Sequence, residues 1–238
     1  MSLDDSRQDC RWHPVPDAVA LGHVAATTIL AAADRAIRAR AQFRLVLAGG
    51  NTPRGAYGEL RAASADWAAW HIYFGDERCL PADDPERNSR MAAECWLDHV
   101  AIPAAQRHAI PAEQGPSAAA THYAATLAVV GEFDLVLLGL GDDGHTASLF
   151  PDHAWGGAPG SADVLAVFDA PKPPPQRVSL SAARLSEARE VVFLVAGADK
   201  RRALSRWREG ARIPAAAIRP AAGVDVIVES ALLSAVAD

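Results

Sequence analysis

The chain has 238 residues, half of them hydrophobic and 22% charged, so it can bury a sizeable core and is not disordered throughout. The formal net charge of -6 argues against non-specific nucleic-acid binding, which needs a basic surface. Charged residues or glycines interrupt each apolar stretch before it reaches the length of a membrane span. We therefore expect neither a nucleic-acid nor a membrane partner.

The cysteines and the N-terminus indicate a cytoplasmic protein. The chain has three cysteines, Cys10, Cys79 and Cys95. Their number is odd and their spacing matches no zinc or CxxC motif, which favours free thiols in a reducing compartment. The first ten residues are polar and acidic, unlike a signal peptide. Residues 1–15 are expected to form a loose N-terminal segment.

Strands and helices are predicted to alternate along the chain. Apolar residues at helical spacing predict helices over 18–40, 54–63, 87–99, 116–130, 182–186 and 199–208, and apolar runs predict strands over 43–48, 70–74, 133–138, 177–180, 190–196 and 224–228, before a C-terminal helix. Continuously apolar strands favour a doubly wound, mostly parallel α/β sheet, Rossmann-like, with helices on both faces. We expect a single domain over residues 1–238.

A glycine-rich turn joins the first apolar run to the helix that follows it. Gly49, Gly50, Asn51 and Thr52 occupy this turn, just before Pro53. Glycines let the backbone approach a ligand, and the free N–H groups at a helix start attract an anion, so this is a candidate phosphate site. The alternative is an ordinary strand-to-helix turn that uses these residues for turning and capping. The turn matches neither dinucleotide nor ATP fingerprints.

The triplet Asp76, Glu77 and Arg78 follows the strand predicted over 70–74. Arg78 could hold an anion while a carboxylate fixes its guanidinium. The alternative is a solvated turn with a local ion pair, because charged triplets are common at turns.

The most informative stretch is GLGDDGHTASLFP, residues 139–151, which follows the buried run FDLVLL. It places His145 at the end of a strand, where doubly wound folds bind ligands. Histidine suits proton removal from water near neutral pH, so His145 is the candidate general base. Asp143 could orient the imidazole or could cap a turn. A satisfied loop histidine is the alternative for His145.

Two other interpretations of this stretch are weaker. Ser148 does not lie in a G-x-S-x-G elbow, so a helix-start role for Ser148 or Thr146 is expected instead. Asp142, Asp143 and His145 lack a second His or Cys to complete a ligand set, so we expect no metal site.

Two further basic residues could complete an anion site in this acidic protein. Arg177 begins the run RVSLS, and Lys200 lies in the first turn of a predicted helix. Each alone is more often a surface charge. Together with Arg78 they would supply the local basic cluster that a phosphate requires.

Five ordered blocks resemble the 6-phosphogluconolactonase family. These blocks are AGGNTPRGAYGEL, FGDERCLPADDPERNSRMA, GLGDDGHTASLFP, RVSLSAARL and VAGADKRRAL, and the resemblance covers residues 20–235. It implies a single α/β domain related to sugar-phosphate isomerases and deaminases. It also implies hydrolysis of 6-phospho-D-glucono-1,5-lactone, the second step of the pentose phosphate pathway. The expected partner is this small phosphorylated lactone, without a cofactor, on a monomer or weak homo-oligomer.

The resemblance also implies residue roles. His145 and Asp143 are the expected catalytic residues, and the expected substrate- and phosphate-binding residues are Gly49, Gly50, Asn51, Thr52, Asp76, Arg78, Arg177 and Lys200. The chain departs from the family by having Asn88-Ser89 where Ser-Asn is usual, and Asn51 where Ser is frequent.

Two rival functions remain. Glucosamine-6-phosphate deaminases are similar around the histidine, but they carry a Glu five residues after it, where this chain has Phe150. They also have Asp-Glu-Tyr where this chain has Asp76, Glu77 and Arg78. A non-catalytic sugar-phosphate sensor is the other rival, and a base beside Asp143 argues against it.

Overall fold

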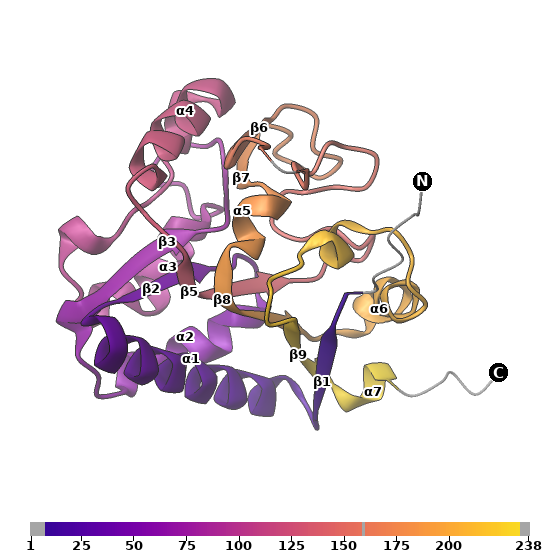
Figure 1. The fold of residues 1–238 in the computed structure, drawn as a ribbon, viewed down its shortest axis with the longest axis horizontal. Coiled ribbons are helices and arrows are strands. Elements are labelled where there is room, and N and C mark those ends of the chain that lie inside the picture. The colour runs from indigo at the N-terminus through magenta and orange to yellow at the C-terminus, as the bar shows by residue number, and fades with distance from the viewer. Residues whose placement is uncertain (1–7, 159, 234–238) are drawn as a thin grey trace.

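A six-stranded parallel sheet forms the centre of the protein (Figure 1). The computed structural model describes residues 8–158 and 160–233. In spatial order the strands are β1 (Cys10–Val15), β9 (Val224–Glu229), β8 (Ala188–Val195), β5 (Phe133–Gly139), β2 (Phe43–Leu47) and β3 (Trp70–Phe74). All neighbouring pairs run parallel, which confirms the predicted α/β class.

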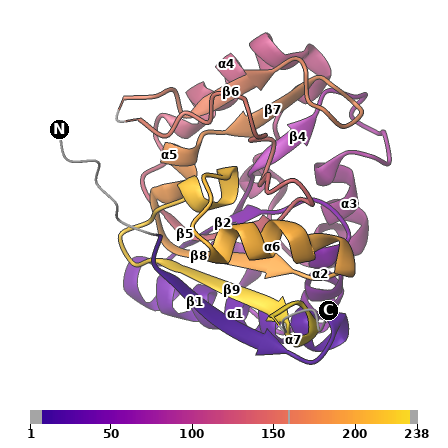
Figure 2. The same ribbon diagram turned by 90° about the vertical axis from the view of Figure 1, so that its right-hand side faces the viewer.

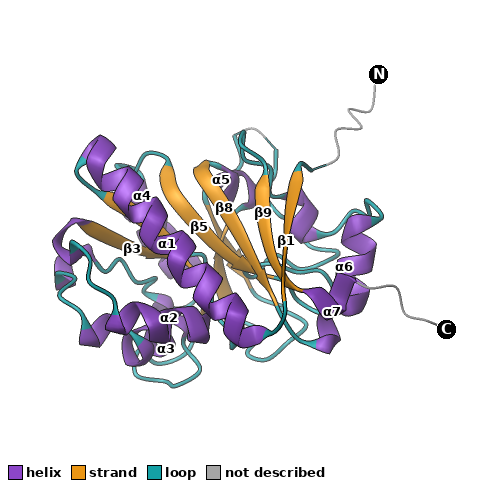
Figure 3. Ribbon diagram, turned by 90° about the horizontal axis from the view of Figure 1, so that it is seen from below, coloured by secondary structure: helices purple, strands orange, loops and turns teal. Residues whose placement is uncertain are grey.

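Helices cover both sides of this sheet. The helices are α1 (Ala18–Arg40), α2 (Thr52–Ala62), α3 (Asn88–Cys95), α4 (Pro116–Leu127), α5 (Ala182–Ser186), α6 (Arg201–Arg208) and α7 (Ser230–Leu233). Figure 3 shows α1 crossing one face of the sheet, and Figure 1 shows α4 and α5 on the opposite side from α1. The described residues contain no helix long and apolar enough to cross a membrane.

Helix α1 shows how local sequence sets an element. Asp17 caps its start by accepting a hydrogen bond from the Ala20 N–H at 2.8 Å. Its buried face carries small and branched apolar residues at helical spacing, among them Leu21, Ala25, Ile29, Ala32 and Ala36. The small side chains let α1 lie close to the sheet and to α2. The prediction over 18–40 is confirmed.

A second, smaller sheet was not predicted. It contains β4 (Asp76–Arg78), β7 (Arg177–Leu180) and β6 (Val164–Val167), paired antiparallel in that order. Figure 2 shows it above the main sheet, with α4 on its outer side. The strand predicted over 177–180 is present, but it belongs to this sheet. One contiguous apolar core includes residues of both sheets.

The N-terminal expectation is wrong for residues 10–15, which form β1 beside β9. The polar side chains of this edge strand hid its pattern. Arg11 and His13 both contact the Asp225 carboxylate on β9, at 2.7 Å each. Residues 1–7 lie outside the described part of the chain. All three cysteines are free, as predicted.

The strand order creates a crevice between β2 and β5. Within the main sheet, the chain continues from β2 through α2 to its neighbour β3 on one side, and from β5 through β6, β7 and α5 to its neighbour β8 on the other. The connections therefore leave the carboxyl ends of these adjacent strands in opposite directions. Such a switch point is where open α/β sheets bind ligands.

A buried carboxylate fixes the elements beneath this crevice. Glu77 is fully buried, and its two oxygens accept hydrogen bonds from the backbone N–H groups of Asn88 and Ser89 at 2.8 Å each. Arg87 Nε lies 3.3 Å from the same carboxylate and is itself almost fully buried. Glu77 therefore caps α3 and ties it to β4.

We expect Glu77→Ala to lower the free energy of unfolding by about 2–4 kcal/mol, because it leaves the buried Nε of Arg87 without a partner and α3 without its cap, while Glu113 still pairs with Arg87 Nη1. Urea denaturation measures this change. Glu94→Ala is the matched control, since Glu94 forms an exposed pair with Arg90 on α3 and its removal should cost less than about 1 kcal/mol. Equal losses in the two variants would show that the buried network does not stabilise the fold.

Candidate active site

One cavity at the switch point brings together almost all the predicted site residues. Its volume is about 320 Å³. The predicted residues that line it are Gly49, Gly50, Asn51, Thr52, Asp76, Arg78, His145, Arg177 and Lys200. Asp143 is not part of the lining and contacts the His145 ring instead. Residues in or after five strands of the two sheets, β2, β4, β5, β7 and β8, thus contribute to a single site.

The glycine-rich turn forms one wall of the cavity, between the end of β2 and the start of α2. Gly50 has φ +88, a conformation that favours glycine. A Cβ atom on Gly49 would overlap the Asn88 amide, so a larger residue would displace Asn88. Asn51 makes no side-chain cap to α2, which leaves its amide free for a ligand at the positive end of this helix.

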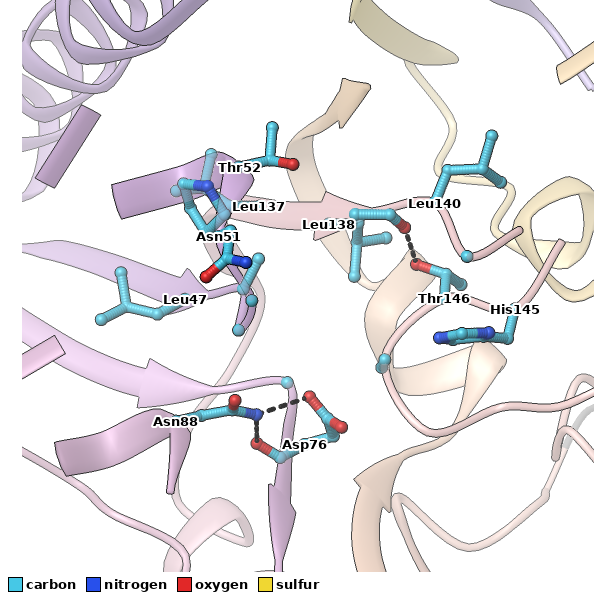
Figure 4. Close-up of a pocket in the computed structure, with 18 of the residues that line it drawn as sticks. Leu47, Asn51, Thr52, Asp76, Asn88, Leu137, Leu138, Leu140, His145 and Thr146 are labelled. Carbon is cyan, nitrogen blue, oxygen red and sulfur yellow. Dashed lines mark hydrogen bonds between the residues drawn. The ribbon is translucent and has the colours of Figure 1, made fainter. Parts of the chain in front are cut away.

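Asp76 is a buried lining residue with two protein partners (Figure 4). One carboxylate oxygen accepts a hydrogen bond from Asn88 Nδ2 at 3.1 Å, and the other accepts one from Ser148 Oγ at 2.5 Å. The triplet 76–78 is therefore a strand with buried acids, and the solvated-turn alternative is wrong. Asp76 links β4, α3 and the loop after β5.

Ser148 and Thr146 do not start a helix, so that expectation is wrong. Thr146 Oγ1 donates to the Gly139 carbonyl at 2.8 Å, and Ser148 Oγ donates to Asp76. Both hydroxyls fix the loop that carries His145.

Antiparallel pairing of β4 with β7 places Arg78 opposite Arg177. Arg78 Nη1 donates to the Glu86 carbonyl at 2.6 Å. Burial lowers the pKa of Arg177, with the nearby Arg78 charge acting in the same direction. In the part of the chain that the structure describes, neither of these neighbouring guanidinium groups forms an ion pair with a carboxylate, although the Asp76 charge lies near Arg177; this arrangement favours an anion between the two arginines.

Lys200 reaches the cavity from the end of β8. It lies in the 3-10 turn Ala198–Lys200, which continues directly into α6, so the predicted position at the start of a helix after a strand is confirmed. Its Nζ atom lies 2.8 Å from the Asp199 carboxylate.

Lys172 was not among the predicted site residues, yet it also lines the cavity. Its ammonium pairs with Asp142. The run of prolines after Lys172 indicated only a loop. The signal that could have found it is its closeness in sequence to Arg177, which anchors the same loop.

His145 and Asp143 form a close pair. His145 Nδ1 lies 2.5 Å from Asp143 Oδ1, and the same oxygen accepts a hydrogen bond from the His145 backbone N–H at 2.9 Å. Asp143 thus orients the imidazole ring and also caps the turn, so it has both of the contacts that were considered as alternatives for it. With Nδ1 occupied, Nε2 is the ring nitrogen left for a ligand. A Cβ atom on Gly141 would overlap this ring, which explains the glycine there.

Burial alone would raise the pKa of Asp143, but hydrogen bonds from the side chain and backbone of His145 outweigh it and lower this pKa to about 2. Asp143 is therefore a carboxylate across the physiological pH range. A carboxylate on Nδ1 favours the tautomer whose Nε2 carries a lone pair and stabilises the ring when it becomes protonated.

Among the described residues, one group has the closeness that a metal site needs: the ligand atoms of Asp142, Asp143 and His145 lie within 4.8 Å of one another. Asp142 is already paired with Lys172, and Asp143 with His145. One nitrogen and two committed carboxylates match a zinc site poorly.

The chain belongs to the glucosamine-6-phosphate isomerase/6-phosphogluconolactonase family, whose model matches residues 16–227. It is 37% identical over 235 residues to a 6-phosphogluconolactonase of Streptomyces coelicolor, covering 90% of each chain. It is also 37% identical over 206 residues to a 6-phosphogluconolactonase of Nostoc, covering 81% of this chain and 82% of that one. A crystal structure of the Thermotoga maritima 6-phosphogluconolactonase superposes with a TM-score of 0.85 at 25% identity, covering 93% of this chain and 100% of that chain.

We expect the Asp143 carboxyl to titrate near pH 2, below its ordinary value of 3.8, when followed by carbon-13 NMR. Because the folded pKa is the lower one, the stabilisation from this group is complete above pH 3.8 and is lost as the pH falls toward 2. In His145→Ala the midpoint should rise toward the ordinary value. An unchanged midpoint in that variant would contradict the hydrogen bond as the cause.

Proposed function

We propose that this chain hydrolyses 6-phospho-D-glucono-1,5-lactone to 6-phospho-D-gluconate, with His145 as general base, in the second step of the oxidative pentose phosphate pathway. The observation that carries the proposal is the His145–Asp143 pair at the edge of a cavity lined by four cations. The names of the relatives at 37% identity support the same activity. The enzyme is cytoplasmic and acts on this small molecule without a metal or cofactor.

The cations position the substrate. Arg78, Arg177 and Lys200 bind the 6-phosphate, together with the backbone N–H groups of residues 50–52. Charge-assisted hydrogen bonds from two arginines suit a phosphate. With the phosphate held, the lactone carbonyl carbon lies within reach of a water molecule on His145 Nε2.

The chemistry is a two-step acyl transfer to water. His145 Nε2 takes a proton from water while the water oxygen bonds to C1, and the carbonyl electron pair moves to the C1 oxygen. The tetrahedral intermediate then collapses, the bond from C1 to the ring oxygen breaks, and the imidazolium donates its proton to that oxygen. Asp143 stabilises the imidazolium between these steps.

Phe150 favours hydrolysis over deamination. It is fully buried, and its ring lies 4.8 Å from the His145 ring. The position five residues after the histidine thus holds an apolar support for the imidazole instead of an acid that could assist ring opening.

We expect His145→Ala to lower the rate of lactone hydrolysis by about 10²–10⁴-fold, because it removes the general base. The lactone is generated in situ, and its loss is followed against the spontaneous background. Binding of 6-phosphogluconate, measured by calorimetry, should change little. His99→Ala, on an exposed turn outside the cavity, is the control and should keep full activity.

A His145→Ala variant as active as the wild type would overturn the assignment of the base. If the wild type itself matched the spontaneous background and still bound 6-phosphogluconate, the chain would be a sugar-phosphate sensor.

We expect Lys200→Ala to raise KM by about 10-fold or more with little change in kcat, because a hydrogen bond to a charged group contributes roughly 1.5–3 kcal/mol. Arg206→Ala on α6 is the matched control, since it removes an exposed cation outside the cavity lining. Equal KM values in the two variants would show that Lys200 does not bind the phosphate.

A further inference from the structure

The loop that carries Lys172 is fixed by a buried guanidinium. Arg177 is 6% exposed. Its Nε donates to the Pro174 carbonyl at 3.1 Å, and its Nη2 donates to the carbonyls of Lys172 at 3.1 Å and Pro173 at 3.2 Å. Hydrogen bonds from a charged donor to three successive carbonyls hold this backbone firmly. Lys172 therefore extends into the cavity from an ordered support.

The ammonium of Lys172 lies on the side of the cavity that carries the base. It pairs with Asp142, and the ligand atoms of Asp142, Asp143 and His145 all lie within 4.8 Å of one another. The glycine-rich turn with Asn51 lies across the cavity from His145 (Figure 4). Lys172 is thus placed near the reacting carbonyl, while the turn is placed for the other end of the substrate.

Breaking the ion pair between Lys172 and Asp142 costs little free energy, so the ammonium can move to another anion. The side chains are 42% and 49% exposed, respectively. Exposed ion pairs stabilise a protein by only about 0–1 kcal/mol. An anionic oxygen that forms inside the cavity, where less water competes, is a stronger partner for the same ammonium.

We propose that Lys172 is a catalytic residue that stabilises the oxyanion at C1, an inference that rests on the proposed lactone hydrolysis. As the water oxygen bonds to C1 and its proton moves to His145, the carbonyl electron pair becomes a full negative charge on oxygen. The Lys172 ammonium leaves Asp142 and donates a hydrogen bond to that oxygen. Collapse of the intermediate returns the electron pair to C1, and Lys172 keeps its protons throughout.

The test is the steady-state kinetics of Lys172→Met, which removes the charge and keeps most of the apolar stem. Removal of an oxyanion donor lowers kcat by about 10²–10³-fold, so we expect a loss of this size with KM changed less than about 3-fold. Lys172→Arg should recover part of the lost kcat. Asp142→Asn is the matched control, because it breaks the same ion pair but leaves the ammonium, and it should keep most of the wild-type kcat.

With an active wild type, an unchanged kcat in Lys172→Met would overturn the inference. A raised KM with an unchanged kcat would also overturn it, because Lys172 would then be a phosphate ligand. An equal loss of kcat in Asp142→Asn would overturn it as well, because the ion pair would then be structural. A wild type no faster than the spontaneous background would instead overturn the proposed function, and this inference with it.

Discussion

The opposite departure of the chain from β2 and β5 is the constraint on which the site depends. Adjacent parallel strands must end at the same edge, and the connections after these two strands diverge to β3 and β8. The space between them cannot be filled by a connecting helix, so it becomes a cavity. Both strand ends carry glycines there, since Gly49 must accommodate the Asn88 amide and Gly141 the His145 ring. The positions of the proposed base, His145, and of the glycine-rich turn follow from this single topological feature.

The sequence predicts much of this arrangement because its main signals are local. The apolar runs and helical periodicity that predict the central strands and α1 depend on residues close together in the chain. His145 could be predicted because one short stretch holds the strand end, the glycines and the acid. β1 could not be predicted as a strand, because its exposed edge carries polar side chains whose partner, Asp225, lies near the other end of the chain. The pairing of β4 with β7 is equally non-local, and no local pattern reveals that Arg78 lies opposite Arg177.

The role of an individual polar residue depends on its tertiary contacts even where its position can be predicted. Ser148 was expected at a helix start, yet its hydroxyl meets Asp76 from a distant strand at 2.5 Å. Glu77 belongs to a triplet that suggested a solvated turn, yet it is fully buried and caps α3. In both cases residue type indicates hydrogen-bonding capacity, and only the packing of separate elements determines which group satisfies it. The same limit applies to Lys172, whose loop is held by a guanidinium that belongs to β7.

An acidic protein can bind an anion because the attraction in this site acts only at short range. The net charge of -6 repels a phosphate from afar, but at physiological ionic strength charges are screened over about 8 Å. Inside the cavity, Lys172 and Lys200 each form an ion pair with an aspartate, whereas Arg78 and Arg177 donate hydrogen bonds to backbone carbonyls. The aspartates partly neutralise the two lysines and so weaken the positive field that the site projects into solvent. In the proposed binding mode, the anionic groups of the ligand replace these partners, so they must match the positions of the four cations. With the proposed roles, a phosphorylated lactone makes contacts that free phosphate cannot, because its phosphate meets Arg78, Arg177 and Lys200 while its carbonyl oxygen meets Lys172.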